Sequence, residues 1–178
     1  MERASLLQSL AMHYLNERST ERMLPYNEDL VERVLFLLSR QKARLEAVRQ
    51  ASKVLEHIYR VEIERVEWLV TEYLLIRLEK LRSNFYLEEY ANLSEAEQTY
   101  HQAYTRLNQD ANIFISEEDI PDRVKKQPKP AYAGIYVLED IPDAVIDNEP
   151  LSLSADDFLI ANVRTISHLI DSMQVLIV

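Results

Sequence analysis

Apolar residues recur every three or four positions through the first part of the chain, a spacing that places them on one face of an α-helix. A first helix is predicted over residues 3–18, with an apolar face made by Leu6, Leu7, Leu10, Tyr14 and Leu15. Asn27 is a favourable N-cap for a second helix, and Glu28 and Asp29 suit the positive end of its dipole. The second helix runs to about Gln50 along the stripe Leu30, Val31, Val34, Leu35, Leu38, Leu45 and Val48.

A third predicted helix is far longer than the average helix. It runs from about Ser52 to about Phe85 without a proline, and at 1.5 Å per residue its length is about 50 Å. Ser94 and Glu97 have the spacing of a capping box, in which each side chain accepts a hydrogen bond from the other residue's backbone N–H. They predict the start of a fourth helix, one face of which carries Tyr100, Tyr104 and Leu107.

The pattern changes in the last third of the chain. Residues 116–134 are polar and proline-rich, which is typical of a linker. Short β-rich segments follow (IYVLEDI, AVIDN, PLSLS, DFLIANV), then one short helix (RTISHLIDSM) and a closing strand (QVLIV). The prediction is an α+β protein. An N-terminal helical bundle-like domain with one very long helix spans 1–112, a proline-rich linker spans 113–133, and a small β-rich domain spans 134–178.

The long helix carries apolar residues around nearly its whole circumference. Arg65 and Arg77 lie among them, so we expect both guanidinium groups to be in the core or an interface, paired with carboxylates and stacked on aromatic rings. Trp68, Leu75 and Leu78 interrupt the narrow polar face, where neighbours from the same chain would leave them uncovered. The helix is either wrapped by its own chain or shared between its own core and a partner. Exposed aromatic and aliphatic clusters favour the second interpretation.

The final four residues are all apolar. Chain ends fray unless they are held, and a small domain has little core with which to cover both faces of such a strand. We therefore expect this strand to lie at an interface as well. The candidate interface residues are Arg65, Trp68, Tyr73, Leu75, Arg77 and Leu78 in the long helix, and Val175, Leu176, Ile177 and Val178 in the last strand.

Charge is distributed unevenly along the chain, whose formal net charge is −10. Residues 131–178 contain eight acidic residues and one basic residue, Arg164. Because this charge repels phosphate, we expect no direct nucleic-acid binding by the C-terminal domain. No apolar run approaches the ~20 residues needed to span a bilayer, and no secretory signal pattern is present, so an intracellular protein without a membrane segment is expected.

The sequence contains few of the elements of an active site. It has no Cys and one Gly, which excludes disulfides, thiolate metal sites and Gly-rich phosphate loops. None of its four His belongs to an H-E-x-x-H motif or follows a Glu by three residues. Ser167 and His168 are adjacent, and on a helix they would point about 100° apart, which does not suit a nucleophile and its base. We therefore expect a non-enzymatic protein with no catalytic, metal or cofactor site.

Several segments, taken in order, resemble one known family. They are MHYLNERSTERMLPYNEDLVERVLFLL, YRVEIERVEWLVTEYLLIRLEKLRSNF, NLSEAEQTYHQAY, PKPAYAGIYVLEDI and PLSLSADDFLIANVRTISHLIDSMQVLIV. This order and spacing resemble the Sld-five subunit of the eukaryotic GINS complex over nearly the whole chain. The most specific parts are Leu15–Arg18 with Met23–Tyr26, the pattern Glu62, Glu64, Arg65, Tyr73, Leu74, Arg77, Leu78 and Lys80, and the strand Val175–Val178.

The resemblance implies a nuclear protein that is one of four related subunits of a heterotetramer, with three Psf-type subunits as its partners. That tetramer joins the Cdc-forty-five protein and the MCM ring as the replicative helicase in chromosomal DNA replication, and it tethers polymerases and adaptors. The family commonly has a Gly-bearing turn before its penultimate strand, where this chain has residues 154–157, SADD. Two alternatives stay open: a stand-alone helical interaction adaptor in another nuclear or cytoplasmic pathway, and a carboxylate-dependent enzyme.

Overall fold

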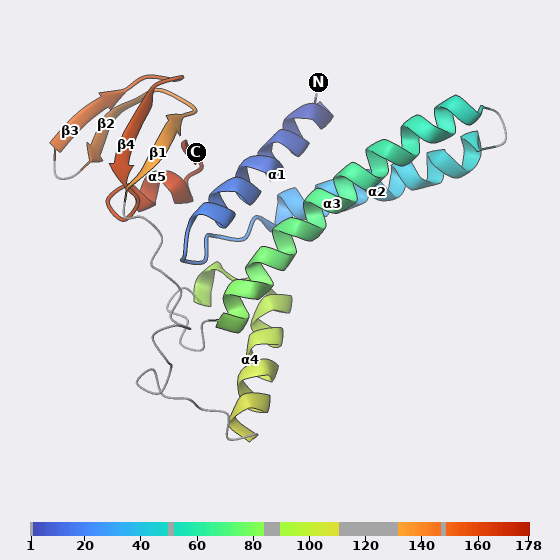
Figure 1. Cartoon of the computed structure of the whole chain (residues 1–178), viewed down its shortest axis with the longest axis horizontal. Helices are drawn as coiled ribbons and strands as arrows, with labels where there is room; N and C mark the ends of the chain where they lie inside the picture. The colour runs from blue at the N-terminus through green and yellow to red at the C-terminus, as the bar shows by residue number, and fades with distance from the viewer. Residues whose placement is uncertain (1, 50–51, 84–89, 111–131, 147–148) are drawn as a thin grey trace.

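The computed structural model describes residues 2–49, 52–83, 90–110, 132–146 and 149–178 of the chain. It confirms the predicted α+β class, because a helical part comes first and a small part built of antiparallel strands follows (Figure 1). Most of the predicted linker lies outside the described residues. Its last two residues, Tyr132 and Ala133, belong to the first strand.

The helices begin and end within three residues of their predicted bounds, wherever those bounds are described. They are α1 Glu2–Ser19, α2 Glu28–Val48, α3 Lys53–Ser83, the short 3-10 helix η1 Tyr90–Asn92, and α4 Glu95–Asp110. Local capping explains this agreement. The Asn27 side chain accepts a hydrogen bond from the Leu30 backbone N–H at 3.0 Å. At the start of α4 the Ser94 N–H donates to Glu97 Oε2 at 2.9 Å, and the Glu97 N–H donates to Ser94 Oγ at 3.3 Å.

The helical core lies where α1 and α2 pack against one side of α3. The long helix buries a narrow stripe with spacings of three or four residues, close to those of a coiled-coil seam. We call this the inner stripe: Ile63, Val66, Val70, Tyr73, Arg77 and Leu81. The α2–α3 pair extends as a projecting arm beyond α1 (Figure 1).

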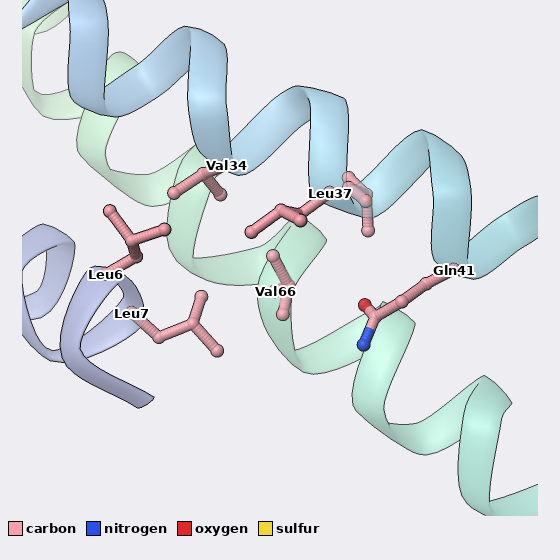
Figure 2. A pocket seen from close by; sticks show the side chains of 7 residues that line it. Leu6, Leu7, Val34, Leu37, Gln41 and Val66 are labelled. Atoms are coloured by element: carbon pink, nitrogen blue, oxygen red, sulfur yellow. The ribbon is translucent and has the colours of Figure 1, made fainter. Parts of the chain in front are cut away.

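A small gap remains where the N-terminal end of α1 meets the arm. In Figure 2, Leu6 and Leu7 point toward Val34, Leu37 and Val66. The gap has a volume of about 30 Å³, whereas small-molecule pockets typically measure about 300–1,000 Å³. It is therefore a packing defect in an apolar core rather than a ligand site.

The first four strands form one long, bent hairpin. They are β1 Tyr132–Val137, β2 Ile141–Ile146, β3 Glu149–Leu153 and β4 Phe158–Asn162. The register that sets Tyr132 opposite Asn162 continues unchanged to Ile141 opposite Leu153, and shifts by one residue before Ala144. The bend divides the hairpin into the β4-β1-β5 sheet and the β2-β3 sheet. The helix α5, Ser167–Asp171, then leads to β5, Val175–Ile177, which pairs antiparallel with β1.

The bend of the hairpin contains a residue in the left-handed conformation that is not a glycine. Asp156 has φ of 71°, in the left-handed region that favours Gly and that Asp tolerates. Its carboxylate accepts a hydrogen bond from the Tyr136 hydroxyl. Asp157 Oδ2 accepts from the Ser154 N–H and Asp140 Oδ1 from the Ala155 N–H, each at 2.8 Å. These carboxylates hold the conformation that a Gly-bearing turn would adopt more readily.

The β-rich part is fastened to α1 by a buried amide. Asn16 Nδ2 donates to the Val175 carbonyl at 2.9 Å, and Asn16 Oδ1 accepts from the Ile177 N–H at 2.9 Å. The side chain of Asn16 thereby takes the place of a neighbouring strand along β5. A second fastening is made by Arg22, which donates to both carboxylate oxygens of Asp171, at 2.6 and 3.1 Å.

Candidate protein-interaction surface

A fully buried arginine fixes the junction of α1, α3 and α4. Arg77 pairs with Glu97 through two hydrogen bonds, Nε to Oε1 at 2.7 Å and Nη2 to Oε2 at 3.0 Å. Its Nη1 donates to Glu17 Oε2 at 2.9 Å and to the Leu24 carbonyl at 2.8 Å. Its Nη2 also donates to the Asn92 carbonyl at 3.0 Å. All five donors of the guanidinium are therefore used, which makes its burial tolerable.

A second cation and two rings complete this buried cluster. Lys80 Nζ lies 2.5 Å from Glu17 Oε1, so two carboxylates face two cations. The guanidinium carbon of Arg77 lies 5.2 Å from the ring centre of Tyr26 and 5.7 Å from that of Tyr73, within cation–π range. Burial raises the pKa of the Tyr73 hydroxyl, partly offset by the charge of Arg77. Arg77 thus has the paired and stacked environment expected from the sequence.

The charge state of the cluster follows from its surroundings. Burial disfavours the charged form of Arg77, but its hydrogen bond to Glu97 and the charge of Glu17 outweigh burial and raise its pKa. For His13, burial and then the charge of Arg77 lower the imidazole pKa. The neutral form is consistent with Asn27 Nδ2, which lies 3.4 Å from His13 Nε2 and can donate to it. The cluster holds helices together, since its hydrogen bonds join α3 to α1 through Glu17 and to α4 through Glu97.

The expectation for Leu78 is wrong, and that for Arg65 is narrowed. Arg65 is exposed, because α1 and α2 cover only the inner stripe and Arg65 lies on the far side of the helix. This excludes the core for Arg65 and leaves the interface as a prediction. Leu78 is half-buried rather than uncovered, because it packs against a small satellite core of Met23, Leu81 and Leu93. The segment between α1 and α2 supplies Met23, a contact that helix periodicity does not reveal.

The remaining candidate residues divide into enclosed and exposed sets. Tyr73 and Arg77 are enclosed by the helical core, and Val175 and Ile177 by the core of the β-rich part. Leu176 is half-buried. The large apolar side chains left uncovered are Trp68, 57% exposed, Leu75, 51% exposed, and Val178, 74% exposed.

Trp68 and Leu75 belong to a second stripe along α3, which we call the outer stripe. Its residues alternate spacings of four and three: Val54, Ile58, Val61, Arg65, Trp68, Glu72 and Leu75. Val61, Trp68 and Leu75 each precede an inner-stripe residue by two positions, which is 200° around the helix. The two stripes therefore lie on nearly opposite sides of α3. Val54, Ile58 and Val61 are all exposed, so they extend the set of interface candidates beyond those predicted from the sequence.

An open groove runs beside the outer stripe, between α1 and α3. Its volume is about 640 Å³. Aromatic and aliphatic side chains form part of it, and the Trp68 ring meets the Tyr14 ring edge-on with 6.1 Å between their centres. Charged groups surround these rings, and the full lining is Tyr14, Arg18, Trp68, Glu72, Ile76, Glu79 and Lys80. An apolar patch with a polar rim is the usual anatomy of a protein interface.

Other chemistry finds no support in the described parts of the chain. Among those residues, no group of three or more His, Asp and Glu is arranged to hold a metal ion. Within the described ranges, none of the helices combines the length and apolar character that crossing a membrane requires. A scan against protein-family models and a search of curated proteins found no match to this chain.

Proposed function

We propose that the chain is a non-enzymatic structural subunit of a GINS-type heterotetramer, in the position of the Sld-five subunit. In this proposal its partners are three Psf-type subunits. Through them it joins the MCM ring and the Cdc-forty-five protein as part of the replicative helicase in the nucleus, and it supports contacts with polymerases or adaptors. The chain needs no cofactor for this role, which is to hold other proteins in position.

The observation that supports the proposal is the outer stripe of α3. A helix that packs only within its own chain needs one apolar stripe, and α3 has a second on its opposite side. Coiled-coil spacing on both sides suits a helix placed between its own core and a helix from another subunit. Arg65, in the middle of the outer stripe, is well placed to pair with a carboxylate or stack on a ring of that subunit.

The buried cluster around Arg77 contributes indirectly. It joins α3 to α1 and α4, so the outer stripe is presented on a rigid support. A rigid surface loses less conformational entropy when it binds than a flexible one does. The proposed role of Arg77 is therefore to position the outer stripe without touching the partner itself.

Co-expression with three Psf-type subunits tests the proposal. The wild-type chain should purify in a 1:1:1:1 complex, and made alone it should self-associate because the outer stripe is uncovered. A variant carrying Trp68→Glu and Leu75→Glu should be lost from the complex. Thr71→Glu is the control, because it adds one negative charge, as each of the two substitutions does, at an exposed position of α3 that lies outside both stripes.

The outcomes separate this proposal from a stand-alone adaptor. Assembly of the control but not of the double variant supports the GINS-type role. A stable, soluble monomer that ignores all three subunits would exclude it. Recovery of one unrelated protein, lost with the double variant, would instead identify an adaptor that uses the same stripe.

A further inference from the structure

The outer edge of β4 is an open strand edge. β4 pairs with β1 along one side, and among the described residues no strand pairs with its other side. In an antiparallel ladder, alternate residues direct their backbone groups to opposite sides. The Val137 N–H on β1 donates to the Asp157 carbonyl at 2.9 Å, so the backbone of Asp157 faces β1. By alternation, the backbone N–H and C=O groups of Phe158 and Ile160 face outward, away from β1.

The side chains at these two positions are apolar and uncovered. Phe158 is 63% exposed and Ile160 is 73% exposed. Gly134 lies opposite Ile160 on β1, and a Cβ atom there would come within 2.9 Å of Phe158 Cζ. The single glycine of the chain thus leaves room for the Phe158 ring to lie over β1, so an aromatic surface is held in place beside the open edge.

The other edges of the two sheets carry features that prevent pairing. The outer edge of β5 is occupied by the Asn16 side chain. Prolines interrupt the hairpin strands at Pro142 in β2 and Pro150 in β3. Proline and lysine are the usual protections of natural edge strands, and β4, with the sequence FLIAN, contains neither. The edge that lacks protection is the one bordered by Phe158 and Ile160.

The negative charge near this edge favours a basic partner. From Glu149 to Arg164 the chain carries three carboxylates, Glu149, Asp156 and Asp157, and one cation, Arg164, so the net charge of this stretch is −2. A second copy of the chain would bring the same acidic surface and a formal net charge of −10. A segment that carries lysine or arginine can pair with the carboxylates, and its apolar residues can pack against the exposed side chains of Phe158 and Ile160.

We propose that β4 accepts an extended basic segment of another protein as an added strand. The backbone groups of Phe158 and Ile160 supply the ladder hydrogen bonds, and their side chains pack against the apolar residues of the segment. The carboxylates along the edge face its cations. This binding site does not depend on the assembly proposed above, because it uses the β-rich part and leaves the outer stripe free.

Fluorescence anisotropy with a labelled ten-residue peptide of alternating lysine and valine tests the proposal on the full-length chain. Ile160→Pro removes an outward N–H and leaves the ladder to β1 intact. It should weaken binding by about tenfold, the equivalent of one hydrogen bond of about 1.4 kcal/mol. Ile160→Val keeps the N–H and a β-branched side chain, and its affinity should stay within about twofold of wild type. A peptide of alternating glutamate and valine should not bind.

Hydrogen exchange gives a readout that needs no variant. The lysine–valine peptide should slow amide exchange at Phe158 and Ile160, the outward positions, more than at Leu159 and Ala161. Equal slowing at all four positions, equal affinity of the two Ile160 variants, or equal binding of the glutamate peptide would overturn the proposal. A homodimer that Ile160→Pro abolishes would show that a second copy occupies the edge, and would overturn the assignment to a basic partner.

Discussion

Two arginines of the long helix differ widely in what they contribute to stability. Arg65 and Arg77 both lie in an apolar sequence environment, twelve positions apart on one helix. Periodicity identifies both as unusual, but it cannot tell which side of a helix its own chain will cover. The difference comes from Glu17 and Glu97, which reach Arg77 from other helices. Glu97 was visible in the sequence as half of a capping box, and its second role as the partner of Arg77 was not.

Removing each arginine separates the two environments. Arg77→Met leaves the carboxylates of Glu17 and Glu97 buried beside a neutral side chain, and should lower the free energy of unfolding by about 3–5 kcal/mol. Arg65→Met removes an exposed charge and should change it by about 0.5 kcal/mol or less. Urea denaturation of both variants, monitored by circular dichroism, measures the difference in the free energy of unfolding. Equal midpoints would show that the buried cluster does not stabilise the fold.

Elements were predictable where local signals define them. Capping side chains within four residues mark the starts of α2 and α4, so these boundaries followed from the sequence. The short strands were also visible as β-rich segments, but their pairing was not. Which strand lies beside which depends on contacts between distant residues, and Asn16 contacts β5 across 159 positions of the chain. Because one amide replaces a neighbouring strand there, no repeating pattern announces it.

The role of Asn16 at β5 can be measured directly. Asn16→Ala leaves the Val175 carbonyl and the Ile177 N–H without their buried partner, at a cost of about 1–3 kcal/mol for each group. Amide exchange at Ile177 should accelerate, while exchange at Val66 in the helical core should stay slow. Gln8→Ala, at an exposed position of the same helix, is the control and should change neither rate. Unchanged exchange at Ile177 in Asn16→Ala would mean that β5 is held by β1 alone.

At the scale of the whole molecule, the two parts of the chain share one support. Leu24, between α1 and α2, belongs to the apolar core of the β-rich part, although it is far from that part in sequence. Arg22 adds its ion pair to Asp171 beside it. The helical part and the β-rich part were predicted as separate domains joined by a linker. The contacts from α1 and from the segment after it make the β-rich part depend on the helical part for some of its burial.

Removing the last strand tests this dependence. Deletion of residues 174–178 takes away Val175 and Ile177, which are 0% and 6% exposed, and at about 1.5–3 kcal/mol for each buried side chain the loss is about 3–6 kcal/mol. It also leaves one edge of β1 without its ladder partner and Asn16 without its backbone partners. Small domains have a total stability of about 5–15 kcal/mol, so the β-rich part should unfold in this variant.

Limited proteolysis provides the measurement for the deletion. Cleavage should become rapid within residues 132–173, while α2 and α3 should resist cleavage. The apolar core between those two helices includes no residue of β5. Val178→Ser is the control, since this side chain is 74% exposed and its backbone N–H still donates to the Gly134 carbonyl. If the deletion and the control are digested alike, β5 contributes little to folding. The four apolar residues at this end of the chain would then be an exposed surface that awaits a partner, and the covering of β5 by α1 would be energetically minor.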